Sequence, residues 1–117
     1  MKTVEEILSE KEVPAIAVDE KGLITFVNQA FETTYGWSAT EMIGQAITEI
    51  IPHHMRDTHS VGFSRFISTE TPTLLGKPLR LPVLCKDGRE IQAEHTIVAE
   101  KQNNQWRIAA TIQPVAG

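Results

Sequence analysis

The sequence has too little of several residue types for many common functions. Cys85 is the single cysteine in 117 residues, so no internal disulfide can form and a reducing, cytoplasmic setting is expected. Cysteine and histidine also lack the spacing of a zinc site. No apolar run approaches the ~20 residues that a membrane-spanning helix needs, and the charged stretch from Met1 to Glu12 does not resemble a signal peptide. We expect no membrane contact by this domain.

Features of nucleic-acid-binding proteins and enzymes are absent as well. The net charge is −4 and the Lys and Arg residues are scattered, so no nucleic-acid partner is expected. The sequence shows no glycine-rich phosphate loop and no Ser-His-Asp set. Asp57 and His59 lie two residues apart on a predicted helix and therefore diverge. We expect no catalysis; a small hydrolase or isomerase with His95 as its base is the enzyme-class alternative.

Turn residues and hydrophobic periodicity divide the chain into short elements. The predicted order is a helix at 4–8, strands at 14–18 and 23–27, helical pieces at 29–35, 39–43, 46–51 and 53–69, and strands at 74–85, 90–100 and 106–115. Residues 1–11 would form an N-terminal capping helix and residues 12–117 the main domain. This order predicts an α+β fold with helices on one side of an antiparallel sheet.

Several residues set the predicted boundaries. Thr3 with Glu6, and Ser38 with Glu41, are spaced as capping boxes, and Asn28 is a favourable N-cap. Two prolines, Pro78 and Pro82, favour an edge position for the strand that carries them.

This arrangement resembles the PAS domain family over residues 12 to 115. The matching stretches are GLITFVNQAF at 22–31, YGW at 35–37, EMIGQ at 41–45 and the KDGR turn at 86–89. The resemblance implies a five-stranded antiparallel sheet whose first and last strands are central neighbours. It also implies that the helices enclose a cavity. The family functions in sensing, dimerisation and relay to a covalently linked kinase, cyclase or transcriptional regulator, as in two-component regulation.

One histidine interrupts the apolar face of the second closing strand. Alternation places Ile91, Ala93, His95, Ile97 and Ala99 on one face, which would line the cavity. A buried imidazole needs a hydrogen bond, a metal or a ligand. A core histidine that a hydroxyl or a water satisfies is one interpretation, and a ligand-binding histidine is the other.

The run at 59–66, HSVGFSRF, is similar to the helix of haem-binding, oxygen-sensing PAS domains. That resemblance implies that His59 ligates the iron and that Arg65 meets a haem propionate. It also implies that Leu74 and Ile97 line the distal side, where gas binds. Haem is therefore a candidate cofactor, with His59 as the metal ligand.

The chain departs from the haem sensors at three positions. Leu79 stands where those sensors have a gas-stabilising arginine, with Arg80 beside it facing the other way. His95 replaces an apolar distal residue, and Thr73 replaces a second propionate contact. His95 would then be a distal ligand or a polar gate.

Two further interpretations concern partners. A PAS domain with a filled core, whose function is dimerisation without any ligand, is the alternative to the sensory reading. We expect a homodimer through a patch formed by Val4, Ile7 and Leu8 of the first helix with Val98 and the outer side chains of 106–115. Cys85 lies at a strand end, unlike the cysteine of photosensing flavin PAS domains, and is expected to be a small core residue.

Overall fold

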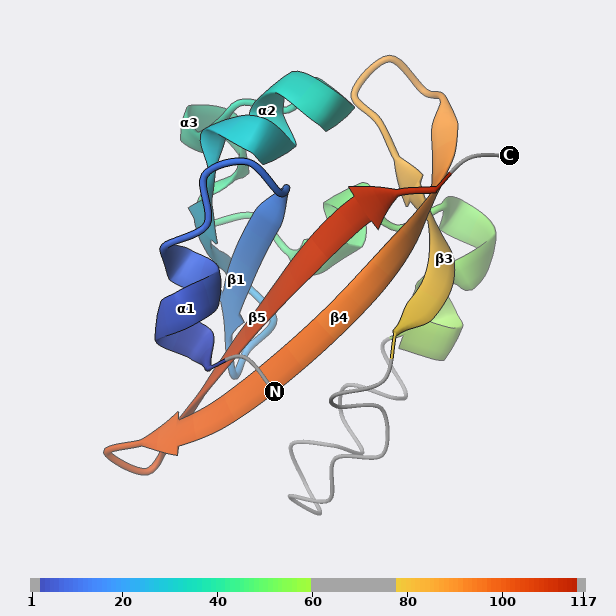
Figure 1. Cartoon of the computed structure of the whole chain (residues 1–117). Helices are drawn as coiled ribbons and strands as arrows, with labels where there is room; N and C mark the ends of the chain where they lie inside the picture. Colours follow the sequence, from blue (N-terminus) through green and yellow to red (C-terminus); the bar gives the residue numbers. More distant parts are fainter. Residues whose placement is uncertain (1–2, 60–77, 116–117) are drawn as a thin grey trace.

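The computed structural model describes residues 3–59 and 78–115. Its elements are α1 (Val4–Leu8), β1 (Ala15–Asp19), β2 (Ile24–Val27), α2 (Gln29–Tyr35), α3 (Ala39–Met42), the 3-10 turns η1 (Ile47–Ile50) and η2 (His53–Met55), β3 (Leu79–Leu84), β4 (Glu90–Gln102) and β5 (Gln105–Pro114). Figure 1 shows β4 and β5 as a long hairpin that extends past the rest of the sheet.

The five strands form one antiparallel sheet in the order β2-β1-β5-β4-β3. The first and last strands, β1 and β5, are therefore neighbours in the middle, as the PAS resemblance implies. Within the described residues β3 pairs only with β4, so the edge position predicted from Pro82 is confirmed. The strand β3 runs from Leu79 to Leu84, and residues 74–77 of the predicted strand lie outside the described residues.

Side-chain caps begin the first three helices where the sequence predicts them. Thr3 and Glu6 form a capping box on α1, and Ser38 and Glu41 form another on α3. Asn28 caps α2, which ends at Gly36 with φ of 84°, a conformation that glycine adopts without steric cost.

The predicted helix at 53–69 starts differently from expectation. Its first turn, η2, is a 3-10 turn, and residues 56–59 are α-helical. Arg56 Nε donates to the carbonyl of Ile51 at 3.0 Å and ties this helical start to the preceding segment. The remainder of the predicted helix lies outside the described residues.

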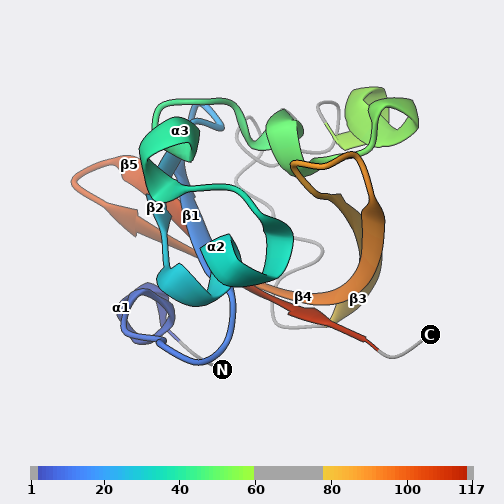
Figure 2. The same ribbon diagram turned by 90° about the horizontal axis from the view of Figure 1, so that it is seen from above.

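The sheet has two differently covered faces, seen from above in Figure 2. On the face that we call inner, the main core packs between the sheet and α2, α3 and η1; it includes Ile16, Phe31, Tyr35, Val83 and Ile112. On the outer face, α1 packs on the small side chains of Ala15, Ala17 and Ala109.

This packing corrects the expected dimer patch. Val4, Ile7 and Val98 were expected to contribute to an exposed surface, but they are 1%, 0% and 3% exposed. They contact one another across the outer face within one chain because α1 folds back onto the sheet. Leu8 and Phe26 remain half-buried at the edge of this cluster.

Candidate functional site

A row of side chains across the inner face contains three of the predicted site residues. His95 on β4 lies directly opposite Leu79 on β3 and Ile112 on β5. Directly opposed residues of antiparallel strands project from the same face. Ala93 and Ile97, two residues to either side of His95, belong to the main core or pack against it. The structure therefore brings Leu79, His95 and Ile97 together on the inner face.

His95 is held by the neighbouring strand. Its Nε2 lies 3.2 Å from the carbonyl oxygen of Leu81, which can only accept, so Nε2 carries the proton and donates. Burial lowers the pKa of His95 below its ordinary value, and the bond to Leu81 opposes that shift only in part. The imidazole is neutral at pH 7, with Nδ1 as an acceptor. The partner is thus a main-chain carbonyl rather than the hydroxyl or water considered from the sequence.

His59 comes from a different element, the helical turn that follows η2. It is half-buried, and this burial lowers the pKa of its imidazole. A neutral imidazole is the form that coordinates a metal. The nearby His53 and His54 are both exposed, as expected for a solvated helix start.

Arg65 and Leu74 lie outside the described residues, as does Thr73. Cys85 is 2% exposed, and burial is the main cause that raises the pKa of its thiol. Its role as a small core residue is therefore confirmed. Within residues 3–59 and 78–115 no group of three or more His, Cys, Asp or Glu side chains could hold a metal ion.

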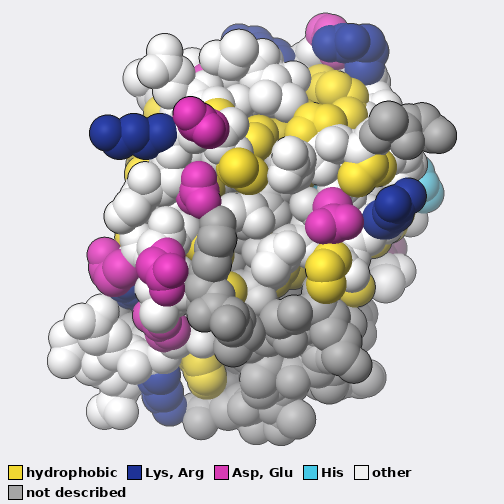
Figure 3. Space-filling view, viewed as in Figure 1, with side chains coloured by type: hydrophobic (Ala, Val, Ile, Leu, Met, Phe, Trp, Pro, Cys, Tyr) yellow, Lys and Arg dark blue, Asp and Glu magenta, His cyan; other side chains and the backbone are white. Residues whose placement is uncertain are grey.

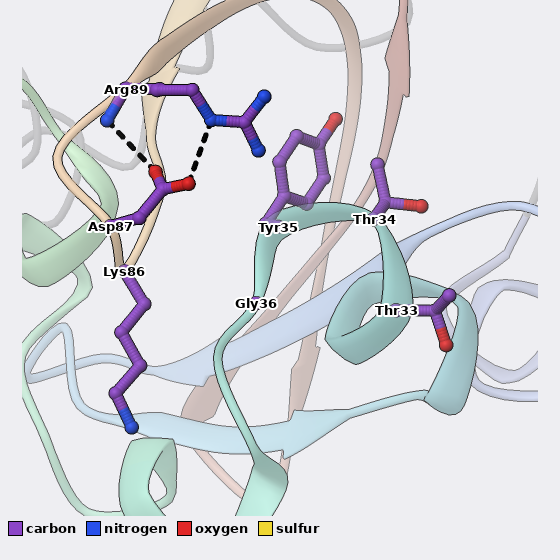
Figure 4. Close-up of a pocket in the computed structure, with 7 residues that line it drawn as sticks. All are labelled: Thr33, Thr34, Tyr35, Gly36, Lys86, Asp87 and Arg89. Carbon is purple, nitrogen blue, oxygen red and sulfur yellow. Dashed lines mark hydrogen bonds and ion pairs between the residues drawn. The ribbon is translucent and has the colours of Figure 1, made fainter.

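Neither His59 nor His95 lines either of two pockets found among the described residues. The first, of about 280 Å³, lies between the end of α2 and the turn from β3 to β4. Figure 4 shows Arg89 and Asp87 facing each other at its rim; their Nε and Oδ2 atoms are 2.7 Å apart. Lys86 instead pairs with Glu41 at 2.7 Å. Because both cations have carboxylate partners, this pocket has little net charge.

The second pocket, of about 470 Å³, lies at the end of the sheet where α1, β1, β2 and the β4–β5 hairpin meet. Its lining includes Ala17, Asp19, Phe26, Trp106 and Arg107. We call it the hairpin pocket. Sequence reasoning missed it because its walls come from four segments far apart in the chain. The single available signal was the length of the predicted closing strands.

Comparison with known proteins gives the family. A model described as the PAS fold matches residues 2–105, and the chain belongs to this family. The match includes α1 as well as most of the sheet. None of the helices within the described residues is long and apolar enough to cross a membrane.

Individual relatives agree with this assignment. Sensor protein FixL of Bradyrhizobium diazoefficiens is 34% identical over 61 residues, which make up 52% of this chain and 12% of FixL. The chain therefore spans only about an eighth of that relative. A PAS domain from Desulfitobacterium hafniense has a TM-score of 0.74 at 18% identity, covering 94% of this chain and 99% of that one.

A further solved structure, the PAS domain of an HTR-like protein from Haloarcula marismortui, also has a TM-score of 0.74. It is 17% identical and covers 96% of this chain and 88% of that chain. At such identities the two structures show the fold, and function has to be argued from the residues of this chain.

Proposed function

We propose that this PAS domain is the sensory part of a larger signalling protein and binds a small ligand on the inner face of its sheet. The observation that carries the proposal is the neutral His95 in the otherwise apolar row with Leu79 and Ile97. Apolar walls with few polar groups are the usual form of a ligand site. The similarity to a protein named as a sensor supports the same role.

Haem is the ligand that we propose, with His59 as the iron ligand. The fit rests on the donor: burial keeps the His59 imidazole neutral, as iron coordination requires. Bound haem would supply an iron that reversibly takes a diatomic gas. Arg65 would pair with a propionate, and Leu74 with Ile97 would line the gas side.

The contact of His95 determines which ring nitrogen would act, whether the residue is a polar gate or a second iron ligand. Its Nε2 proton is already donated to Leu81, so the ring offers the acceptor Nδ1 unless that bond breaks. Leu79, directly opposite, has no donor to give. His95 would therefore be the polar group beside the bound ligand, while the apolar side chain of Leu79 would exclude water there.

Haem titration tests this proposal. Wild-type protein should give a shifted Soret band that saturates at one haem per chain, and His59→Ala should abolish the shift. His95→Ala should keep the Soret shift but change its position or its response to gas. His54→Ala is the matched control, because His54 is exposed on the preceding turn, and it should bind as the wild type does.

Three outcomes would contradict this assignment. No Soret shift in the wild type excludes haem, and a shift that survives His59→Ala excludes His59 as the ligand. Loss of binding in His54→Ala would place the iron at the helix start instead.

We propose that the sensory domain passes its signal on through dimer contacts. The second candidate function is a dimerisation module that binds no ligand. The observation that favours this candidate is the filled inner core, in which Phe31, Tyr35 and Met42 are at most 1% exposed. Since α1 covers the outer face, a second copy would contact the outward side of α1 and the half-buried Leu8 and Phe26.

Sedimentation of the wild type and of a chain lacking residues 1–11 measures this contact. We expect a dimer for the wild type and a shift toward monomer for the truncated chain. The point variant Leu8→Asp, which leaves Val4 and Ile7 in place, should also weaken the dimer. An unchanged dimer in both variants rules out α1 as its main support.

A further inference from the structure

One arginine on the outer face of the sheet connects α1 to the β4–β5 hairpin. The Nη2 atom of Arg107 lies 2.6 Å from Oε1 of Glu5, which is on α1. In a second contact the amide of Val4 donates to Oε2 of Glu100 at 3.2 Å. This amide belongs to the first turn of α1, where amides have no partner within the helix. Two polar contacts from the hairpin therefore hold α1, in addition to the buried side chains of Val4 and Ile7.

The strand register gives Arg107 two further acidic neighbours. On β5 it lies directly opposite Glu100 of β4 and directly opposite Asp19 of β1. Directly opposed side chains project from the same face, with their Cβ atoms about 4.5–5.5 Å apart. The carboxylates of Glu5, Asp19 and Glu100 thus lie around one guanidinium. Figure 3 shows acidic side chains gathered over the region of α1.

Arg107 is placed to exchange one acidic partner for another. Within the part of the chain that the structure describes, its Nη2 bonds to Glu5, and its Nε is buried without a hydrogen bond. Asp19 accepts turn amides with Oδ1 alone, so among the described residues its Oδ2 has no hydrogen bond. Glu100 would lose its bond to Val4 when α1 leaves the sheet. Arg107 would then have a carboxylate on each neighbouring strand, so undocking of α1 would not leave this buried cation unpaired.

The helix α1 also has little stability of its own. It has five residues, too few for a stable isolated helix, and it packs on a surface of alanine side chains. Elements with few buried contacts open locally while the rest of the domain stays folded. We propose that α1 is a releasable strap and that Arg107 is its switch residue. Arg107 pairs with Glu5 when the strap is docked and with a carboxylate of the neighbouring strands when it is released.

Release of the strap would control the dimer contact, a consequence that rests on the proposed relay through α1. The outward side of α1 and Leu8 leave the sheet together, so a released strap withdraws the surface that a second copy would contact. Docked and released chains would therefore differ in dimer affinity. The strap itself needs no ligand and no second copy, because its contacts described above lie within one chain.

Amide hydrogen exchange of the wild-type chain and of point variants tests the strap. The amides of Ile7 and Ser9 are hydrogen-bonded within α1, and their protection reports its opening. Glu5→Gln removes the docked partner of Arg107 and should lower this protection about two- to fivefold, the size of one exposed ion pair. Asp19→Asn keeps the turn acceptor but removes a competing charge, and it should raise the protection by a similar factor.

Charge reversal separates the ion pair from a general loss of stability. Glu5→Arg and Arg107→Glu should each lower the protection of α1, and the double variant, which restores opposite charges, should recover it. Glu90→Gln removes a charge from an exposed position at the other end of β4 and is the matched control. The amide of Ile112, which donates to the carbonyl of Pro14, should keep its protection in Glu5→Gln, as expected for local opening.

Three results would overturn the proposal. They are unchanged protection of α1 in Glu5→Gln, unchanged or lower protection in Asp19→Asn, and an equal change in Glu90→Gln. Sedimentation of the same variants tests the relay separately, with a weaker dimer expected for Glu5→Gln and a tighter one for Asp19→Asn. A strap that opens in Glu5→Gln while the dimer stays unchanged would contradict the relay and support the strap alone.

Discussion

Replacing Asn28 with alanine is expected to lower the free energy of unfolding by about 3–5 kcal/mol, since several buried polar groups would lose their partners. Asn28 is 8% exposed and makes four hydrogen bonds. Its Oδ1 accepts the amides of Ala15 and Phe31 at 3.0 and 2.9 Å. Its Nδ2 donates to the carbonyls of Glu10 and Val13 at 3.1 and 2.8 Å.

One side chain thus joins the link after α1, the start of β1 and the first turn of α2. An uncompensated buried donor or acceptor costs about 1–3 kcal/mol. Denaturant unfolding measures the change. Asn28→Ser should lose less, because a serine can still cap α2, whereas Asn28→Asp should lose the two bonds that Nδ2 donates.

Gln29→Ala, at the adjacent exposed position, is the control and should change stability by no more than about 0.5 kcal/mol. If Asn28→Ala cost under about 1 kcal/mol, water would have replaced the lost bonds and the network would not organise the N-terminal region.

Local signals in the sequence were enough for most of the fold. The capping boxes at Thr3 and Ser38, the cap at Asn28 and the turn at 86–89 are each formed by residues close in sequence, so pattern alone located them. The central pairing of β1 with β5 joins residues about 90 positions apart and required the family resemblance.

The sequence pattern could not predict the surface on which α1 packs. The apolar side of α1 is evident from Val4, Ile7 and Leu8, but a five-residue helix does not encode which surface it will cover. It covers the sheet of its own chain, because alanines at 15, 17 and 109 leave room for Val4 and Ile7.

The sequence predicted which face of the sheet the site residues occupy, but not the group to which His95 is hydrogen-bonded. Alternation placed His95 and Ile97 on the inner face, and the structure agrees. The carbonyl of Leu81 could not be foreseen as the partner, since it depends on the register in which Leu79 faces His95.

Replacing Phe31 with alanine should cost about 3–5 kcal/mol, the range for removing a buried aromatic ring. Phe31 is 0% exposed, and its ring centroid lies 4.8 Å from that of Tyr35. The loss combines the transfer of the ring to water with a cavity that the surroundings cannot fill. Tyr35 is fixed because its hydroxyl donates to the carbonyl of Ile112 at 2.8 Å, so it is poorly placed to move into the space.

The variant also tests whether the inner core can hold a small guest. A dry apolar cavity binds benzene, and a ligand that binds only the folded state raises its melting temperature. We expect benzene to stabilise Phe31→Ala and to leave the wild type unchanged. Phe31→Leu should lose less stability and respond less to benzene.

Thermal unfolding with and without benzene supplies the measurement. Thr33→Ala, exposed on the same helix, is the control, and its stability should stay within about 0.5 kcal/mol of the wild type. A small loss in Phe31→Ala with no benzene effect would mean that the core closes over the missing ring. A core that collapses so easily could not keep an apolar chamber open beside His95, and the ligand-free candidate would then be favoured.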